Sequence, residues 1–333
     1  MQTAYSLVRS PSHHYEGHPE SPDRFSLLEE IFAAHSEIRE LGAEPAGLDE
    51  IGRVHTSSMI QALEMASPGL IDHAPTYVTQ SSYDDALLAA GATLACSRAV
   101  WDGTAKNAFA LVRPPGHHAE PTHAMGFCIF NNIAIAAKDA LARGAERAMV
   151  IDYDAHHGNG TQAAFLDDES LGFLSLHQGG IYPGTGHLED APHARGRIVN
   201  LPLPAFSGDA GYRQIAGEII TPFVHNFKPE MIFVSVGFDS HWSDPLTQLG
   251  LSTMGFFEIS RHLVELADEV CGGKIVFVLE GGYDARNVAK GVGAVFLAEA
   301  GQKYASETGD LSPYPEPNID NLIQAVHEFH QLS

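Results

Sequence analysis

The stretch AMVIDYDAHHGNG, residues 148–160, runs from an apolar segment directly into a polar loop that contains two glycines. The apolar segment, Ala148–Tyr153, is typical of a buried strand in a parallel sheet. Successive side chains of a strand point to opposite faces, so Asp152, Asp154 and His156 share one side if the extended backbone continues. Because open α/β sheets bind ligands where their strands end, the stretch predicts an α/β fold with a functional site here.

Apolar runs and helical patterns alternate along the chain, which indicates a parallel sheet covered by helices. The other predicted strands are Ala108–Val112, Gly172–Leu176, Met231–Val236 and Lys274–Leu279. The predicted helices are Ser21–His35, Ser82–Asp102, Asn132–Arg143, Gly211–Asn226 and Thr253–Val270. After the proline-rich segment 311–317, apolar residues at helical spacing predict a helix within residues 317–333 that docks on the body. No composition shift marks a boundary, so we expect one catalytic domain over residues 1–333.

The composition is that of a globular protein: 333 residues, of which 44% are hydrophobic and 18% charged. The formal net charge of -23 argues against a nucleic-acid partner, because such surfaces need clustered Lys and Arg. Cys96, Cys128 and Cys271 show no C-x-x-C spacing, so neither a disulfide framework nor a cysteine-based zinc site is indicated. We find no signal peptide and no apolar run of about 18 residues, so we expect a cytoplasmic protein without a membrane partner.

Polar loops follow four of the predicted strands. They read RPPGHH (residues 113–118), DYDAHHGNG (152–160), GFDS (237–240) and EGGY (280–283). If the four strands are parallel, these loops meet at one edge of the sheet. Their joint occurrence at strand ends indicates a site more strongly than any one of them alone.

Three side chains of these loops form a candidate metal-ligand set, namely Asp154, His156 and Asp239. Carboxylates packed beside an imidazole would repel one another or remain desolvated without a cation. Three nitrogen and oxygen ligands are the number found in catalytic zinc sites, which keep one position open for water and substrate. A zinc ion can polarise a carbonyl and lower the pKa of water to about 7.

Other residues of the loops suit proton transfer. The tandem imidazoles of His117 and His118 can accept and donate protons. Asp152 and Asn159 are candidates for fixing the tautomers and orientations of these rings. The phenol of Tyr283 can donate a hydrogen bond to a developing oxyanion. Together the loops predict metal-assisted hydrolysis of an amide or an ester.

A string of motifs extends beyond these loops and begins near His18-Pro19-Glu20. It comprises RPPGHHA, GFCIFNN, DYDAHHGNGTQ, SLHQ, YPGTG, GFDS, DPL and EGGY. With these motifs the chain resembles the zinc-dependent deacetylases of the arginase and histone deacetylase superfamily, specifically the class II histone deacetylases and their bacterial relatives. The resemblance implies an α/β fold, an open three-layer sandwich around a mostly parallel sheet of about eight strands.

The resemblance also implies roles in catalysis. One zinc ion (Zn2+) per chain would be held by Asp154, His156 and Asp239. His118 would act as general base and then as general acid, with His117 as its electrostatic partner. Tyr283 would donate a hydrogen bond to the substrate carbonyl. The implied substrate is the N-acetyl or N-acyl amide of a lysine side chain in a peptide or protein, or of a similar small amine.

The resemblance further implies a substrate tunnel, an acetate channel and cation sites. Gly126, Phe127 and Tyr182 would line the tunnel, Leu246 would lie at its rim, and Arg24 would lie near the channel. A structural potassium ion (K+) would bind at Asp152, Asp154, His156, Ser175 and Leu176. A second potassium ion would bind at Phe165, Asp168, Leu171 and Tyr212.

Three positions bear on how far the resemblance extends. Asn159 stands where class I enzymes carry aspartate, and a neutral amide stabilises an imidazolium less than a carboxylate does. Tyr283 stands where class IIa enzymes, which are weak on acetyl-lysine, carry histidine, so we expect deacetylase activity. The rim aspartate that grips the substrate backbone in many members has no clear match, since Pro75 occupies the first aligned position and Asp72 is the nearest acidic residue.

Alternatives to a lysine deacetylase remain open. A dimanganese site of the arginase type would need carboxylates where this chain has Gly158 and His241, which favours one zinc ion. An acetylpolyamine amidohydrolase shares the chemistry, although Leu246 replaces the glutamate that attracts a distant ammonium in eukaryotic polyamine enzymes. A catalytically inactive acyl-lysine binder is disfavoured by the complete ligand set. The natural substrate, zinc versus iron(II), and a possible homo-oligomer cannot be read from the sequence.

Overall fold

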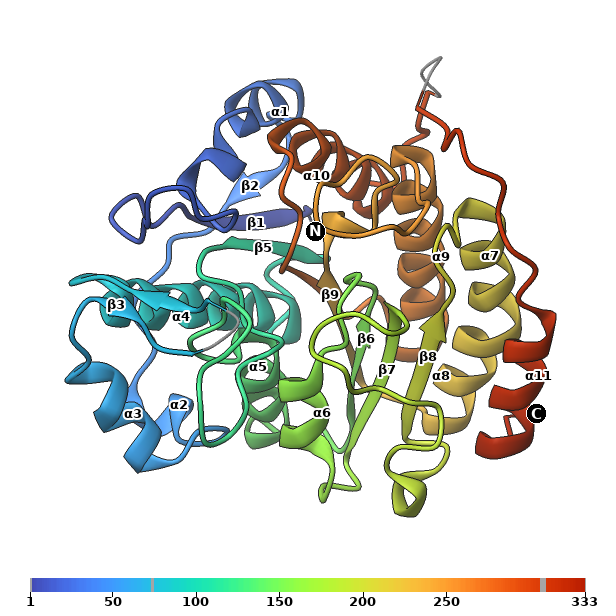
Figure 1. Cartoon of the computed structure of the whole chain (residues 1–333), viewed down its shortest axis with the longest axis horizontal. Coiled ribbons are helices and arrows are strands. Elements are labelled where there is room, and N and C mark those ends of the chain that lie inside the picture. Colours follow the sequence, from blue (N-terminus) through green and yellow to red (C-terminus); the bar gives the residue numbers. More distant parts are fainter. Residues whose placement is uncertain (1, 73–74, 306–309, 333) are drawn as a thin grey trace.

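A wholly parallel sheet of eight strands forms the centre of the computed structural model (Figure 1). The structure describes residues 2–72, 75–305 and 310–332. In their order across the sheet, the strands are β2 (Arg39–Glu40), β1 (Ala4–Val8), β5 (Ala108–Val112), β10 (Ile275–Leu279), β9 (Met231–Val236), β6 (Ala148–Asp152), β7 (Leu171–Gln178) and β8 (Ile198–Leu203). A separate antiparallel pair joins β3 (Gly69–Leu70) to β4 (Tyr77–Val78).

Helices cover both faces of the sheet and complete a three-layer sandwich (Figure 1). One face carries α2 (Leu48–Ile51), α3 (Ser57–Glu64), α4 (Ser82–Trp101), α5 (Asn132–Ala142) and α6 (Asn159–Phe165). The other carries α1 (Leu28–Ala34), α7 (Asp209–Ile215), α8 (Thr221–Phe227), α9 (Thr253–Cys271), α10 (Ala285–Glu299) and α11 (Asp320–His330). The sandwich expected from the resemblance is therefore confirmed, with a sheet that is parallel throughout.

Strand β6 shows why the sheet needs both layers. Met149 and Ile151 pack into the core shared with α9 and α10, whereas Ala148 and Val150 pack into the core shared with α4 and α5. All four side chains are fully buried. A strand with two buried faces reads as a continuous apolar run, which is the pattern that predicted it.

The five predicted strands are confirmed: β5 and β9 have the predicted bounds, and the ends of β6, β7 and β10 shift by one or two residues. Strand β6 ends at Asp152, and residues 153–158 leave the extended conformation, so alternation along a strand does not position Asp154 and His156. Strand β7 continues through Gln178. Strands β1, β2 and β8, which lie at or next to the two edges of the sheet, were not predicted.

Two predicted helices differ from the structure. The helix expected over Ser21–His35 is a 3₁₀ turn (Pro22–Phe25) followed by α1, because Arg24 turns inward and donates to the carbonyl oxygens of Gly282 and Glu280. The helix expected over Gly211–Asn226 contains a π-helical turn at Ala216–Ile220 between α7 and α8.

The predicted C-terminal helix is α11. It begins at Asp320, after the proline-rich segment. Ile323 and Val326 bury its apolar face in the core that packs against α9 and α10.

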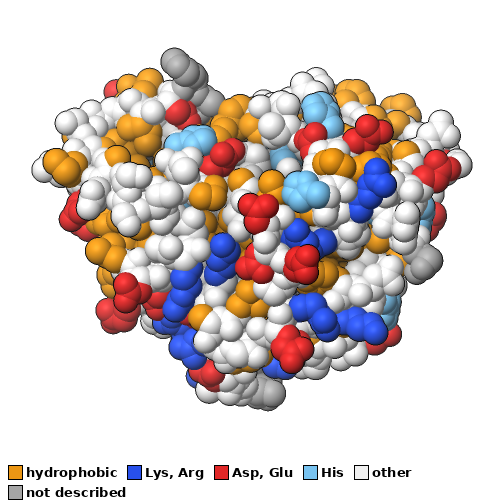
Figure 2. Space-filling model, turned by 90° about the horizontal axis from the view of Figure 1, so that it is seen from below, with side chains coloured by type: hydrophobic (Ala, Val, Ile, Leu, Met, Phe, Trp, Pro, Cys, Tyr) orange, Lys and Arg blue, Asp and Glu red, His pale blue; other side chains and the backbone are white. Residues whose placement is uncertain are grey.

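On the surface seen from below Figure 1, Lys and Arg side chains alternate with Asp and Glu side chains (Figure 2). Among the described side chains on that face, Lys and Arg form no single continuous basic patch (Figure 2). Within the described residues, no helix combines the length and the apolar character needed to cross a membrane.

Candidate metal centre and active site

The four polar loops leave the four central strands of the sheet. Strands β5, β10, β9 and β6 are consecutive neighbours, and all of them run in the same direction. The loops that follow them therefore meet at one edge of the sheet, as predicted from the sequence.

Three ligand atoms converge where these loops meet. One side-chain atom each of Asp154, His156 and Asp239 lies within 4.8 Å of the other two. His156 Nδ1 is 3.2 Å from Asp154 Oδ1 and 2.9 Å from Asp239 Oδ2. Both carboxylates are fully buried. The structure thus brings the three predicted metal ligands together.

Backbone amides hold the two carboxylates in place. Gly281 N donates to Asp154 Oδ2 at 2.8 Å, and Ala155 N donates to Asp239 Oδ1 at 3.0 Å. A Cβ at Gly281 would lie 2.3 Å from Asp239 Oδ2 and 2.6 Å from Asp154 Oδ2, so no larger residue fits there. Gly281, the first glycine of the EGGY loop, is therefore required for the two carboxylates to approach each other.

The charges of this cluster suit a divalent cation. Burial alone would lower the pKa of His156, but hydrogen bonds to Asp154 and Asp239 outweigh burial and raise that pKa to about 10. Burial and the neighbouring Asp154 carboxylate raise the pKa of Asp239. Two buried carboxylates and one imidazole call for positive charge, and a set of three nitrogen and oxygen donors fits Zn2+.

The tandem histidines have different partners. His117 Nδ1 lies 3.0 Å from Asp152 Oδ2, a buried carboxylate. His118 Nδ1 lies 2.8 Å from Asn159 Oδ1, a neutral amide oxygen. The two ring centroids are 4.0 Å apart. Asp152 and Asn159 therefore occupy the orienting positions predicted for them.

The His117 and His118 rings differ in charge because their surroundings shift their pKa values in opposite directions. Burial would lower the pKa of His117, but the carboxylates of Asp154 and Asp152 raise it to about 10. Burial, reinforced by the positive charges of His117 and His156, lowers the pKa of His118 well below its ordinary value. His118 is consequently neutral at pH 7 and able to accept a proton.

A cavity of about 200 Å³ opens above the metal-ligand cluster. The residues that line it are Pro75, His118, Gly126, Phe127, His156, Tyr182, Leu246 and Tyr283. All four residues predicted to contact the substrate are among them. Leu246 is 45% exposed, which fits a position at the mouth. Burial, with a smaller contribution from the charge of Asp239, raises the pKa of Tyr283 well above its usual value and keeps the phenol protonated as a donor.

Gly126 brings the tunnel wall close to the candidate base. Its φ of +57° lies in the left-handed region, and a Cβ there would be 2.4 Å from His118 Cδ2. The adjacent Phe127 ring meets the Tyr283 ring edge-on, with centroids 6.0 Å apart.

Behind Tyr283 lies a buried ionic cluster that sequence reasoning only partly anticipated. Arg24 Nε donates to the Gly282 carbonyl at 2.6 Å, and its Cζ lies 5.3 Å from the Tyr283 ring centroid. Glu20 pairs with Arg24 at 3.1 Å and with Arg113 through two hydrogen bonds. Burial would raise the pKa of Glu20, but Arg113 lowers it to about 2. Glu20 and Arg113 both lie in quoted motifs, but their pairing depends on tertiary packing.

Asp244, of the DPL motif, is a residue whose role the sequence did not reveal. Its Oδ2 accepts from Tyr283 N and its Oδ1 accepts from Leu246 N, both at 2.9 Å. Asp244 thus ties the tyrosine backbone to the mouth of the cavity. Its place in a motif shared with the family was the one available signal.

Two further predictions concern the rim and a second metal. Asp72 accepts hydrogen bonds from Thr76 N and Oγ1 at 2.9 and 2.8 Å, and Thr76 Oγ1 accepts from Phe127 N. Asp72 is therefore connected to the tunnel wall through Thr76.

His241 turns toward Ser243 and Asp310, so it does not supply the ligand that a dimanganese site needs.

The first predicted potassium site combines residues of β6, β7 and the loop after β6. Asp152 and Ser175 are register partners, and Leu176 follows Ser175 along β7. The Ser175 hydroxyl lies 2.9 Å from His177 Nδ1. Potassium binding at this position stays a prediction.

The second predicted potassium site is wrong because a guanidinium group occupies it. Arg197 Nη1 donates to the carbonyl oxygens of Phe165, Asp168 and Leu171 at 2.8, 2.9 and 3.0 Å. Tyr212 lies in the core on the opposite face of the sheet. A fixed positive charge therefore satisfies the carbonyl groups that were expected to bind an ion.

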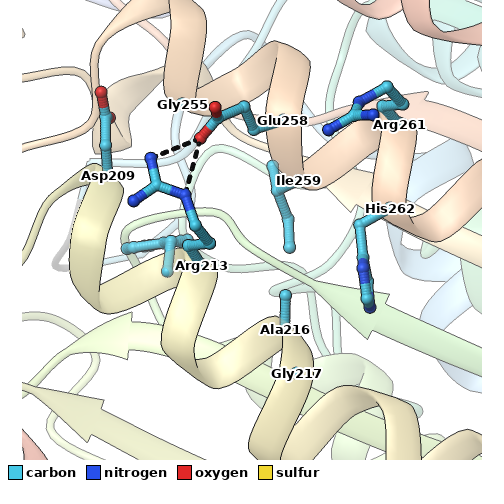
Figure 3. A pocket seen from close by; sticks show the side chains of 10 residues that line it. Asp209, Arg213, Ala216, Gly217, Gly255, Glu258, Ile259, Arg261 and His262 are labelled. Carbon is cyan, nitrogen blue, oxygen red and sulfur yellow. Dashed lines mark hydrogen bonds and ion pairs between the residues drawn. The ribbon is translucent and has the colours of Figure 1, made fainter.

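Another cavity, of about 160 Å³, lies between α7 and α9 (Figure 3). Its charged walls are partly paired, since Arg213 Nη2 lies 2.8 Å from Glu258 Oε2 (Figure 3). None of the predicted catalytic or zinc-binding residues lines it. The site therefore belongs to the cavity above Asp154, His156 and Asp239.

Comparisons with known proteins agree with this geometry. Residues 18–298 match the histone deacetylase domain. The chain is 38% identical to histone deacetylase 14, chloroplastic, of Arabidopsis thaliana, over 98% of this chain and 84% of that protein. It is 40% identical to a probable deacetylase of Archaeoglobus fulgidus, over 91% and 87% of the two chains.

A bacterial relative and a solved structure extend the likeness. The histone deacetylase-like amidohydrolase of Pseudomonas aeruginosa is 39% identical, over 80% of this chain and 73% of that protein. The crystal structure of the HDA15 HD domain superimposes with a TM-score of 0.87 at 32% identity, covering 99% of this chain and 94% of the other. The chain accordingly belongs to the histone deacetylase family.

Proposed function

We propose that this deacetylase hydrolyses the N-acetyl or N-acyl amide of a lysine side chain, or of a similar amine, and that it depends on one zinc ion. One observation carries the proposal: His118 and Tyr283 line the same cavity as His156 of the Asp154–His156–Asp239 cluster. The pKa of His118 is lowered and that of Tyr283 is raised, which suits a base and a hydrogen-bond donor. A base, an oxyanion donor and a three-ligand metal site are the parts that metal-assisted amide hydrolysis requires.

His118, Tyr283 and His117 have separate roles in the proposed reaction. Bound zinc supplies Lewis-acid polarisation of the amide carbonyl and makes water more acidic. The neutral His118 takes a proton from the attacking water at Nε2, since Nδ1 faces Asn159. Tyr283 donates to the oxyanion, and His118 then returns the proton to the leaving amine. His117, held charged by Asp152 and Asp154, adds positive charge beside the site.

The shape of the cavity favours a narrow, unbranched acyl-amine stem. The Phe127 and Tyr182 rings belong to its wall, and the Tyr182 ring meets the His118 ring edge-on at 5.2 Å between centroids. Leu246 presents an apolar surface at the mouth. This surface offers no charge to a distant ammonium, so acetyl-lysine is favoured over acetylpolyamines.

A comparison of substrates tests the proposal. Zinc-loaded enzyme is assayed on acetyl-, trifluoroacetyl- and longer acyl-lysine peptides beside acetylputrescine, with and without a hydroxamate chelator. We expect the highest kcat/KM on an acyl-lysine peptide and loss of turnover with the hydroxamate. Higher kcat/KM on acetylputrescine would assign the polyamine alternative. Binding of acyl-lysine peptides without any turnover would assign an inactive binder.

The proposal extends to potassium at the first predicted site, with Asp152, Asp154, His156, Ser175 and Leu176 as candidate ligands. The pairing of Asp152 with Ser175 across two neighbouring strands supports it.

A further inference from the structure

The Asn159 side chain lies between the candidate base and a carboxylate outside the cavity. Its Oδ1 is 2.8 Å from His118 Nδ1, and its Nδ2 donates to Glu120 Oε1 at 2.8 Å. Asn159 is 7% exposed, so its amide is nearly sealed from water. His118, Asn159 and Glu120 thus form a continuous chain of hydrogen bonds.

The Glu120 carboxylate fixes the orientation of the Asn159 amide. An ionised carboxylate only accepts hydrogen bonds, so the Asn159 NH₂ group must point at Glu120. The amide oxygen then faces His118 Nδ1 and accepts its proton. This leaves Nε2 without a proton, which is the tautomer that a general base needs.

The opposite orientation of the amide would disable the base. A flipped Asn159 would present its NH₂ group to Nδ1, and the ring proton would move to Nε2. His118 could then no longer accept a proton from water. Apart from Glu120, the described acceptors near Asn159 Nδ2 are Met125 Sδ at 3.3 Å and the His118 carbonyl at 3.5 Å, which are weaker or more distant partners.

Glu120 is well anchored for this task although it is half-buried. Its backbone N donates to the His123 carbonyl at 3.0 Å, and its own carbonyl accepts from His55 Nδ1 at 3.0 Å. Its side chain does not line the cavity above the metal ligands. It therefore acts on the reaction through Asn159.

We propose that Glu120 is a positioning residue that locks the Asn159 amide and thereby sets the tautomer of His118. The inference rests on the proposed function, in which His118 is the general base. It explains how an enzyme with a neutral amide behind its base still presents that base correctly. In a chain with aspartate at position 159, two equivalent oxygens would make such a lock unnecessary.

The experiment measures kcat and KM on an acetyl-lysine peptide for zinc-loaded wild type and variants. A base in the wrong tautomer can lose about 10⁴-fold in kcat, and Glu120→Ala only frees the amide to flip, so we expect kcat to fall about 10-fold to 10²-fold. KM should stay within about twofold, because Glu120 does not touch the cavity. Glu120→Gln keeps an acceptor oxygen for Asn159 and should restore most of the activity. Thr122→Ala, an exposed change in the same loop, is the matched control and should match wild type.

A second set of variants tests whether the effect of Glu120 depends on the Asn159 amide. In the Asn159→Asp background, Glu120→Ala should lower kcat no further. Equal losses from Glu120→Ala in both backgrounds, or an unchanged kcat in the wild-type background, would overturn the inference. So would a Glu120→Gln variant that loses as much as Glu120→Ala.

The ¹⁵N shifts of the His118 ring provide a readout that does not depend on turnover. We expect a protonated Nδ1 in wild type and a mixture of tautomers in Glu120→Ala. Wild type without turnover would refute the proposed function. The ¹⁵N shifts would still test whether Glu120 fixes the orientation of the Asn159 amide. A single Nδ1-protonated form of His118 in Glu120→Ala would overturn the inference about Glu120. Thermal melts of the same samples identify any unfolded variant.

Discussion

At the scale of single residues, two adjacent imidazoles differ in charge because their partners differ. His117 faces carboxylates that hold it positive, whereas burial and the positive charges of His117 and His156 keep His118 neutral beside its amide partner. The pair therefore combines a fixed positive charge with a proton acceptor within a ring separation of 4.0 Å. Tyr283 completes the set as a donor whose proton is retained across the physiological pH range.

Removing the Tyr283 hydroxyl tests the oxyanion role. Tyr283→Phe should lower kcat by about 10²-fold to 10³-fold, as expected for loss of one oxyanion donor. The metal ligands are untouched, so zinc content should equal that of wild type. Steady-state kinetics and metal analysis on one preparation check both expectations. Turnover close to wild type would remove Tyr283 from the mechanism.

At the scale of elements, the site results from where parallel strands end. The buried central strands were predictable because both of their faces are apolar, and their polar ends were predictable because the loops are rich in Asp, His and Gly. Edge strands such as β2, with only two residues, carry too little pattern to be recognised. The break before α1 was not predictable, because it depends on contacts of Arg24 with the distant residues 280 and 282.

The candidate metal ligands and the histidine partners could be predicted by motif, whereas contacts between distant loops could not. Nothing in the local sequence joins Glu120 to Asn159 or places Arg197 among the carbonyls after α6. The first contact depends on how the loops after β5 and β6 meet, and the second on how β7 and β8 and their connecting segments pack. The prediction of a second potassium ion failed for this reason.

Arg197 should be a stabilising element of the turn between α6 and β7. Arg197→Ala removes four hydrogen bonds from a guanidinium to backbone carbonyls, including one to Leu166 at 2.6 Å. We expect the free energy of unfolding to fall by about 2–4 kcal/mol, because the carbonyls lose a charged donor and the group is only partly exposed. Urea unfolding measures the change. Arg286→Ala, at a highly exposed arginine, is the control, and a loss no larger than in that variant would contradict the expectation.

At the scale of the whole molecule, two cores enclose the sheet, and α10 buries a carboxyl group at its last residue. Glu299 is fully buried, and neither of its carboxyl oxygens has a hydrogen-bond partner among the described residues. Burial raises its pKa well above the ordinary value of 4.5. The folded state therefore keeps a proton that the unfolded chain releases above pH 4.5.

The pH dependence follows from this shift. A raised folded-state pKa gives stability that is complete below the unfolded pKa and is lost as pH rises toward the folded pKa. Glu299→Gln removes the titration, so its stability relative to wild type should improve between pH 5 and pH 7, by up to about 1.4 kcal/mol per pH unit. Urea unfolding of both proteins at several pH values measures the difference. A difference that does not change with pH would show that Glu299 does not carry the proton.

The most direct test of the account measures bound zinc and deacetylase turnover on the same samples of wild type, Asp239→Ala and His118→Ala. We predict about one zinc per chain with turnover in wild type, loss of both in Asp239→Ala, and retained zinc without turnover in His118→Ala. Full turnover by Asp239→Ala, or about two manganese ions per active wild-type chain, would contradict a single zinc ion held by Asp154, His156 and Asp239.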